Sequence, residues 1–260
     1  GVYSASNYLR LYKNGVLVDE QTTGVATSIS YYTGTDLIFG RRSVDAQSYW
    51  DGKIDEVRVY NTAISEDDIE RLYSLGIEEK SSGTHTSASL DTESSSSDIE
   101  SITWTAAGDD TGDGDTPYST PNLIAQWDFN ESSGTTADNE GSCGSSCDGT
   151  LTNMTTTSQD AGLGTGWTSD KRRWGNGALM FDGDNDYVSV PSTTDLRPSA
   201  NFSIEAWVNT DEIGDYQQII NHAENGGGDD GWGLRIEPSG RVGFNASNTD
   251  GWWNGHITSD

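Results

Sequence analysis

The sequence has few basic residues, few prolines, few cysteines and no long apolar run. Its 260 residues include only 14 lysines and arginines against 42 aspartates and glutamates, a formal net charge of −28. Such a surface repels nucleic-acid phosphates and anionic membrane heads, so we expect no nucleic-acid partner. No apolar stretch approaches the ~20 residues that a membrane-spanning helix needs, so we expect no membrane insertion. The acidity indicates either a well-hydrated surface or carboxylates that gather on Ca²⁺.

Apolar residues make up only 32% of the chain, but nine Trp, 11 Tyr and 5 Phe offset this low fraction. Each large aromatic side chain can bury on the order of 150–250 Å², so a hydrophobic core can form. The chain has 31 glycines and only 5 prolines, and its apolar residues occur in short runs between Gly, Asp and Asn. This pattern is typical of strands joined by turns rather than of a helical bundle.

The two cysteines, Cys143 and Cys147, lie in a Gly/Ser-rich loop with the sequence SCGSSC. Their spacing does not fit CxxC redox chemistry, and no His lies nearby to complete a zinc site. We predict a small disulfide that contributes about 2 kcal/mol in the chain-entropy model. Together with four Asn-x-Ser/Thr sequons, it favours an oxidising setting, so we expect a secreted or cell-surface protein. The sequons begin at Asn130, Asn153, Asn201 and Asn245.

Composition divides the chain into three segments. Residues 1–77 and 123–260 are patterned, whereas 78–122 is rich in Ser, Thr, Asp and Gly and has almost no apolar periodicity. The middle segment cannot bury enough surface to offset its ordering entropy, so we predict a disordered linker there. The patterned segments contain an Asn14-Gly15 pair typical of a hairpin turn, and a helix predicted to begin after Ser65 and to end at Gly76. Strands are predicted over Asp36–Gly40, Lys53–Tyr60, Leu123–Phe129, Ala178–Asp182, Tyr187–Pro191, Phe202–Asn209, Gln217–His222, Trp232–Glu237 and Arg241–Ala246.

Several motifs resemble one family in two separate halves. The runs LYKNGVLV, LIFG and WDGKIDEVRVYN resemble the C-terminal half of a laminin-G-like, concanavalin A-like jelly roll; they are Leu11–Val18, Leu37–Gly40 and Trp50–Asn61. The runs AQWDFNE, GALMFDG and FSIEAWV resemble its N-terminal half; they are Ala125–Glu131, Gly177–Gly183 and Phe202–Val208. The resemblance implies an all-β fold, a two-sheet antiparallel jelly-roll sandwich with one short helix.

The order of the two halves is reversed relative to the family. This implies that the chain runs from the end of one repeat, through the linker, into the start of the next, without the strand that would join the second half back to the first. The two halves can then associate as a circular permutant, because domain termini usually lie close together. The alternative is two separate half-sandwiches, which would expose long sheet edges and an apolar face.

The resemblance also implies a structural Ca²⁺ site. The turn DGDND starts like an EF-hand loop, but the sixth and twelfth positions hold Tyr187 and Thr193 instead of Gly and Glu, so that motif is excluded. In the family, this turn and the acids of the I-D-E-V strand lie near Ca²⁺; the alternative is a polar turn and a solvated strand end. The candidate ligands are Asp182 and Asp55, with Asp128, Asp184, Asp186 and Glu56 as weaker candidates.

Catalysis is not expected. Related glucanases carry E-x-D-x-x-E on one strand, which places two carboxyl groups about 5–5.5 Å apart in one cleft. The nearest run here has adjacent acids, Asp55 and Glu56, which a regular strand points to opposite faces. The three histidines are scattered, and the chain has no G-x-S-x-G elbow.

Binding is the more natural use of this composition, because exposed aromatic rings stack on sugar faces. The candidates lie in Gly/Asp-rich stretches and are Trp232, Trp252, Trp253 and Trp50. The alternative is that these rings are structural. Trp127 and Trp207 lie in predicted strands, and we predict that both belong to the core.

We therefore predict a non-catalytic extracellular recognition or adhesion module that binds a glycan or a cell-surface or matrix protein, with Ca²⁺ as a structural cofactor. Two alternatives stay open. The chain can be a structural spacer repeat in a large surface protein, or an accessory module of a glycoside hydrolase.

Overall fold

The structure is a computed structural model of the chain. It describes residues 1–31, 34–43, 47–77, 122–157, 164–170, 172–173, 175, 177–224, 230–247 and 255–259. The predicted linker, 78–122, lies outside the described residues apart from Asn122, whose carbonyl accepts a hydrogen bond from the Asn61 amide at 2.9 Å.

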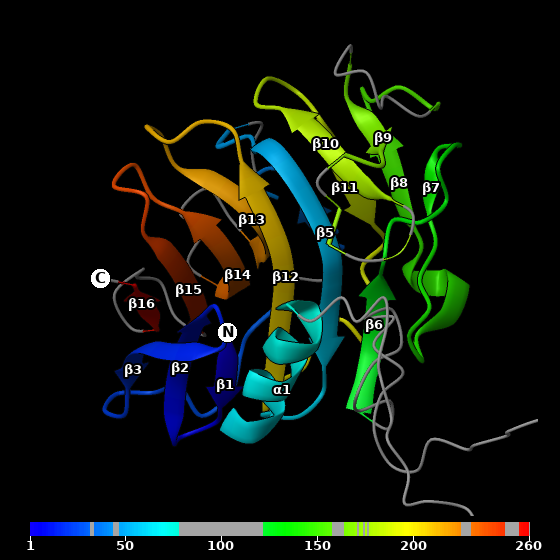
Figure 1. Cartoon of the computed structure of the whole chain (residues 1–260). Helices are drawn as coiled ribbons and strands as arrows, with labels where there is room; N and C mark the ends of the chain where they lie inside the picture. Colours follow the sequence, from blue (N-terminus) through cyan, green and yellow to red (C-terminus); the bar gives the residue numbers. More distant parts are fainter. Residues whose placement is uncertain are drawn as a thin grey trace, which may run out of the picture.

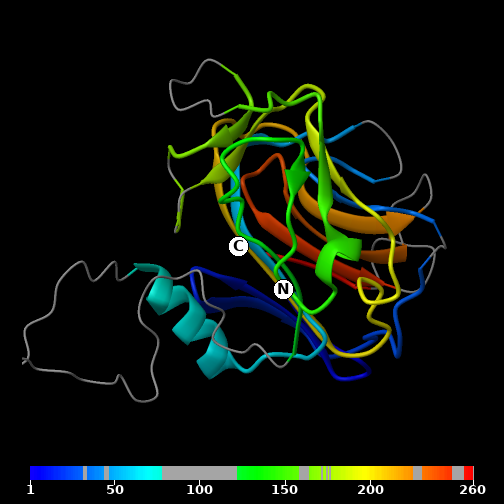
Figure 2. The ribbon, with the colours of Figure 1, turned by 90° about the vertical axis from the view of Figure 1, so that its right-hand side faces the viewer.

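Two antiparallel sheets pack face to face, and helix α1 (Glu66–Ile77) lies on the outer face of the first sheet (Figures 1 and 2). The first sheet has the order β3 (Val16–Gln21), β2 (Tyr8–Lys13), β1 (Val2–Ser4), β12 (Phe202–Thr210), β5 (Asp51–Tyr60), β10 (Ala178–Asp182) and β9 (Gly166–Thr168), with β6 (Leu123–Trp127) also paired to β5. The second has the order β16 (His256–Thr258), β15 (Val242–Ser247), β14 (Asp230–Ile236), β13 (Gln217–Glu224), β4 (Leu37–Phe39), β11 (Tyr187–Val190), β8 (Gly149–Thr152) and β7 (Thr136–Ala137). The predicted two-sheet sandwich is confirmed.

Both sheets contain strands from the two halves of the sequence. In the first sheet, β5 pairs along one edge with β12 and along the other with β10 and β6, all from the second half. In the second sheet, β4 lies between β13 and β11, so that Phe39 is opposite both Ile220 and Val188. The halves therefore form one permuted sandwich and not two half-sandwiches.

The hairpin turn and the helix cap predicted in the first half are present, but the predicted helix end is not. Asn14 and Gly15 have φ values of 55° and 76°, the positive φ pair of a two-residue hairpin turn between β2 and β3. Ser65 caps α1, because its hydroxyl accepts a hydrogen bond from the Asp68 amide at 3.1 Å while the Asp68 carboxylate accepts one from the Ser65 amide. Gly76 does not end the helix, which continues to Ile77.

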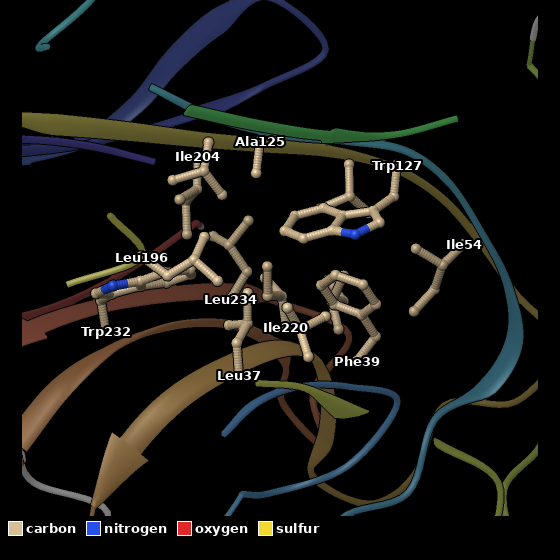
Figure 3. Close-up of a cluster of buried hydrophobic side chains, with 14 of the residues drawn as sticks. Leu37, Phe39, Ile54, Ala125, Trp127, Leu196, Ile204, Ile220, Trp232 and Leu234 are labelled. Atoms are coloured by element: carbon tan, nitrogen blue, oxygen red, sulfur yellow. The ribbon is translucent and has the colours of Figure 1, made fainter. Parts of the chain in front are cut away.

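Buried aromatic rings fill the space between the sheets. Trp127 lies edge-on to Phe39 with ring centroids 4.8 Å apart, so a ring from each half meets at the centre (Figure 3). The indole nitrogen of Trp127 donates to the Cys147 carbonyl at 3.0 Å, which satisfies its polar group in the core. A second apolar cluster, including Tyr60 and Leu72, packs between the first sheet and α1.

The ring of His222 lies between two backbone carbonyls, one from each half, and in its neutral form it donates a hydrogen bond to one of them. It is buried on β13, with Nδ1 2.9 Å from the Leu196 carbonyl and Nε2 3.1 Å from the Thr35 carbonyl. Burial lowers the pKa of His222 to about 4 although both carbonyls favour the protonated ring. Between pH 6.5, the ordinary pKa of the ring, and about pH 4, the unfolded chain therefore binds a proton that the folded chain does not.

We predict that His222 makes the protein less stable as the pH falls from about 6.5 to about 4, by about 3 kcal/mol in the free energy of unfolding. Urea unfolding at a series of pH values would measure this as the difference between the wild type and His222→Gln, which cancels the contributions of other groups. A difference that does not change with pH would contradict the prediction.

We also predict that residues 1–77 and 122–260, co-expressed as separate polypeptides, co-purify as a 1:1 complex, because β5 and β4 are each enclosed by strands of the other half. Size-exclusion chromatography with light scattering would test this. As a control, Ile54→Asp places a charge in the shared core and should abolish the complex. Two independently folded halves that elute separately would contradict the single sandwich.

Candidate functional site

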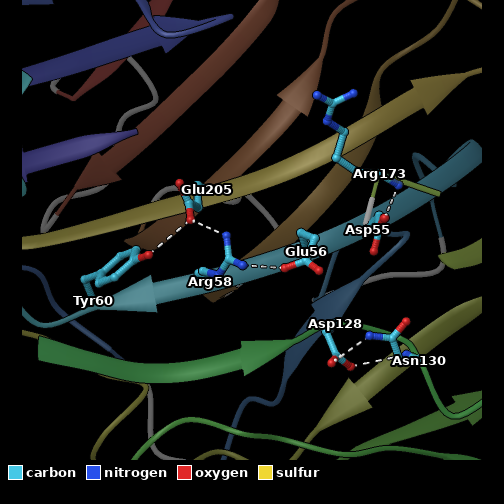
Figure 4. Close-up of polar contacts among 8 residues, drawn as sticks. All are labelled: Asp55, Glu56, Arg58, Tyr60, Asp128, Asn130, Arg173 and Glu205. Atoms are coloured by element: carbon cyan, nitrogen blue, oxygen red, sulfur yellow. Dashed lines mark hydrogen bonds and ion pairs between the residues drawn. The ribbon is translucent and has the colours of Figure 1, made fainter. Parts of the chain in front are cut away.

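A cluster of charged side chains lies on the outer face of the first sheet, and we call it the outer-face cluster (Figure 4). Strand β5 supplies most of its members and β12 supplies one; they are Asp55, Glu56, Arg58, Tyr60 and Glu205. The members of the cluster on β5 are buried, whereas Glu205 is partly exposed. Glu56 is 0% and Arg58 is 1% exposed.

A β-bulge places the adjacent acids in this cluster. Glu56 has a φ of 50°, and the register of β5 against β12 shifts at this point. The extra residue lets both Ile54 and Val57 face the core, and the Glu56 side chain then reaches Arg58. The prediction that Asp55 and Glu56 point to opposite faces of a regular strand is therefore wrong, because the strand is not regular there.

Arg58 bridges the two glutamates of the cluster. Its guanidinium is 2.6 Å from a Glu56 carboxylate oxygen and 3.1 Å from one of Glu205, and the Tyr60 hydroxyl donates to the same Glu205 oxygen at 3.1 Å. Burial alone would lower the pKa of Arg58, but the charges of Glu205 and Glu56 hold it above its ordinary value. Both carboxylates thus serve as ion-pair partners.

Asp55 and Trp207 extend the cluster along the sheet. A carboxylate oxygen of Asp55 accepts a hydrogen bond from the Arg173 amide, and the Arg173 guanidinium lies 4.5 Å from the centre of the Trp207 ring. Tyr73 of α1 stacks on Trp207 with ring centroids 5.6 Å apart and an interplanar angle of 13°. We predicted Trp207 as a core residue, but it lies on the outer face and attaches α1 to the sheet.

The six predicted calcium ligands do not come together as one site. Asp55 and Glu56 contact Arg173 and Arg58, and Asp128 accepts hydrogen bonds from Asn130. Of the remaining three, Asp182 is the last residue of β10, and Asp184 and Asp186 lie in the turn between β10 and β11.

Within that turn, the carboxylates bind backbone amides. Asp182 accepts from the Asp184 amide at 2.9 Å, and Asp186 accepts from the Asp182 amide at 3.3 Å. Burial, with a smaller effect of the Asp182 charge, raises the pKa of Asp186 to about 6. Across the described ranges, no three His, Cys, Asp or Glu side chains are arranged to hold a metal ion. The side chains therefore do not fit the shared Ca²⁺ site implied by the resemblance, and Ca²⁺ binding stays a prediction.

The predicted ligand-binding tryptophans divide into two pairs. Trp50 and Trp232 are 0% exposed and belong to the core between the sheets, so the prediction that they are exposed ligand-stacking rings is wrong. Trp50 directly precedes β5 and its amide donates to the Gly40 carbonyl at 2.8 Å, while Trp232 is part of β14. Trp252 and Trp253 lie outside the described residues.

The predicted disulfide is present and joins Cys143 to Cys147 across a short 3₁₀ turn, Gly144–Cys147. The position of this disulfide indicates a structural role. The Cys147 carbonyl, at the end of this turn, accepts the indole hydrogen bond of Trp127 in the core.

The family comparison agrees with the permuted order. A family model described as the concanavalin A-like lectin/glucanases superfamily matches residues 1–70 and 182–260, more than half of the chain in two stretches. The first stretch carries β1 to β5 and the second β11 to β16. No curated protein and no solved structure matches the chain. Among the described helices, none has the length and apolar character to cross a membrane.

We predict that Arg58→Met destabilises the protein by about 3–5 kcal/mol, because it leaves the Glu56 carboxylate buried without its cation. The double variant Arg58→Met/Glu56→Gln should recover much of the loss. Urea unfolding would measure both. Arg10→Met is the matched control, because it breaks the exposed Arg10–Glu20 pair and should cost less than about 1 kcal/mol. Equal effects of the two single variants would contradict the structural role of Arg58.

Proposed function

This chain belongs to the concanavalin A-like lectin/glucanases superfamily, and from that membership we propose that it is a non-catalytic recognition module that binds carbohydrate. The observation that carries the non-catalytic part is the arginine bridge of the outer-face cluster. The superfamily by itself is compatible with both enzymes and binding proteins, so the choice between them depends on the carboxylates.

The described carboxylates of the outer-face cluster are engaged in the fold. Glu56 and Glu205 share Arg58, and Asp55 accepts the Arg173 amide. A glycosidase needs two carboxyl groups that face one glycosidic bond, one as acid and one as base or nucleophile. The pairs here support the sheet instead, because each carboxylate compensates a buried donor.

Carbohydrate is the proposed ligand, with Trp252 and Trp253 as the proposed stacking residues. Two adjacent aromatic side chains with Asp, Asn and Gly neighbours supply both a stacking surface and hydrogen-bonding groups for sugar hydroxyls. The disulfide and the sequons support a secreted or cell-surface location. A structural Ca²⁺ and a role in adhesion remain part of the proposal.

We predict that the chain binds a subset of glycans on an array and that Trp252→Ala/Trp253→Ala reduces binding at least about tenfold, a loss of about 1.4 kcal/mol. Tyr216→Ala is the control, because Tyr216 is an exposed aromatic residue distant in sequence from both tryptophans. Repeating the array with EDTA and with CaCl₂ tests the metal. Release of reducing ends from any bound glycan would contradict the non-catalytic proposal, and unchanged binding by the double variant would contradict the proposed site.

A further inference from the structure

Neighbouring strands of the second sheet carry polar residues on the outer face of that sheet. The strands are β13, β14 and β15, which lie side by side (Figure 1). Ile220 of β13 and Phe244 of β15 face the core, so the next residue of each strand faces outward, since successive side chains point to opposite faces. These residues, Asn221 and Asn245, are both opposite Gly233 of β14 and form one row across the sheet.

Gly233 lets the two asparagine side chains of this row come together. A Cβ at Gly233 would lie 2.9 Å from Asn221 Nδ2 and 3.3 Å from Asn245 Oδ1, so a donor and an acceptor approach the same point from two strands. Gln218, opposite Arg235 on the same outer face, adds a third side-chain amide. We call Gln218, Asn221, Gly233 and Asn245 the amide patch.

The side chains of the amide patch are nine-tenths buried, yet several of their polar atoms have no protein partner. Gln218, Asn221 and Asn245 are 3%, 4% and 7% exposed. Asn221 Oδ1 accepts hydrogen bonds from the amide and the hydroxyl of Ser43, at 3.0 and 2.6 Å. Within the described part of the chain, Gln218 Oε1, Asn221 Nδ2 and both polar atoms of Asn245 have no hydrogen-bond partner. Because buried polar groups are almost always hydrogen-bonded, these amides indicate that a bound molecule, water or ligand, supplies the partners.

The charged groups next to the amide patch compensate one another. Arg235 reaches past Gly243 and donates to Glu237 at 3.0 Å and to His256 Nε2 at 2.9 Å. An arginine can only donate, so Nε2 accepts this bond and the ring is neutral. Burial, followed by the Arg235 charge, lowers the pKa of His256 to about 4, although Glu237 and Asp19 oppose the shift. A ligand at the patch therefore meets amide donors and acceptors beside a compensated ion pair.

We propose that the amide patch is a binding subsite for a neutral sugar unit of a glycan. A sugar hydroxyl both donates and accepts hydrogen bonds, and a side-chain amide offers an NH₂ donor and a carbonyl acceptor. Two adjacent hydroxyls of one sugar ring therefore pair with Asn221 Nδ2 and Asn245 Oδ1, which approach each other over Gly233. The sugar thereby supplies the partners that the protein does not.

Charge selects neutral over acidic sugars at this subsite. A carboxylate or sulfate group needs a cation, but the guanidinium beside the patch, Arg235, already pairs with Glu237. The formal net charge of −28 further disfavours an anionic ligand. This inference rests on the proposed carbohydrate recognition and adds to it a set of residues and a class of sugar.

The test compares variants of the patch on an array of neutral and acidic glycans, with protein produced in bacteria so that the Asn245 sequon stays unmodified. Asn245→Ala removes an amide that has no protein partner, so we expect at least about tenfold weaker binding of neutral glycans. Its Tm should change by less than about 2 °C. Gly233→Ala places a methyl group against both asparagine amides and should weaken binding as well. Asn61→Ala, at an exposed asparagine that follows β5, is the matched control and should bind like the wild type.

A titration of the wild type with the strongest neutral glycan of the array gives a second readout, which holds even where a variant is unstable. In nitrogen-15 NMR spectra, the side-chain NH₂ signals of Asn221 and Asn245 should shift, and that of Asn61 should not. If glycans bind but these signals stay in place and the variants bind like the wild type, the subsite is wrong and carbohydrate recognition stands. Binding of acidic glycans alone would also overturn the subsite only. A wild type that binds no glycan would overturn both.

Discussion

Enclosure of β5 is the constraint on which the rest of the structure depends. This strand carries residues from the first half of the sequence, and every strand that pairs with it comes from the second half. Its inward side chains, Ile54, Val57 and Val59, belong to the core, while Arg58 organises the outer face. Neither half can bury its apolar side chains alone. The sandwich, the outer-face cluster and the packing of α1 on the sheet therefore all require both halves.

Much of this fold could be predicted from the sequence, because its main strands carry clear alternation between turn residues. The runs at Ala178–Asp182 and Phe202–Asn209 correspond to β10 and β12 almost residue for residue. The missed strands are short. β1, β7, β8, β9 and β16 have two to four residues each, too few for a periodic pattern, and they exist because neighbouring strands supply their hydrogen bonds.

The candidate site was less predictable, for a physical reason. In a regular strand, Asp55 and Glu56 would point to opposite faces of the sheet. They do not, because Glu56 adopts a positive φ, and no local sequence motif predicts this. Trp50 and Trp232 have Gly and Asp neighbours typical of loops, yet they are buried. The glycine near Trp50 does not mark a loop. Gly52 allows close packing against β12, because a Cβ at this position would lie 2.3 Å from the Asn209 carbonyl oxygen. Such close approaches depend on the partner strand, which sequence patterns do not reveal.

The pairing of strands from different halves within each sheet also has a kinetic consequence. The ion pair between Arg58 and Glu205 closes a loop of 147 positions, and the pairing of β5 with β12 requires the same long closure. Folding slows as native contacts become more distant in sequence, because the entropy of loop closure is lost before the contacts form. During synthesis, the edge of β5 that pairs with β12 therefore stays unpaired until Phe202–Thr210 has been synthesised. In a cell, this is the interval in which a chaperone would matter most to this chain.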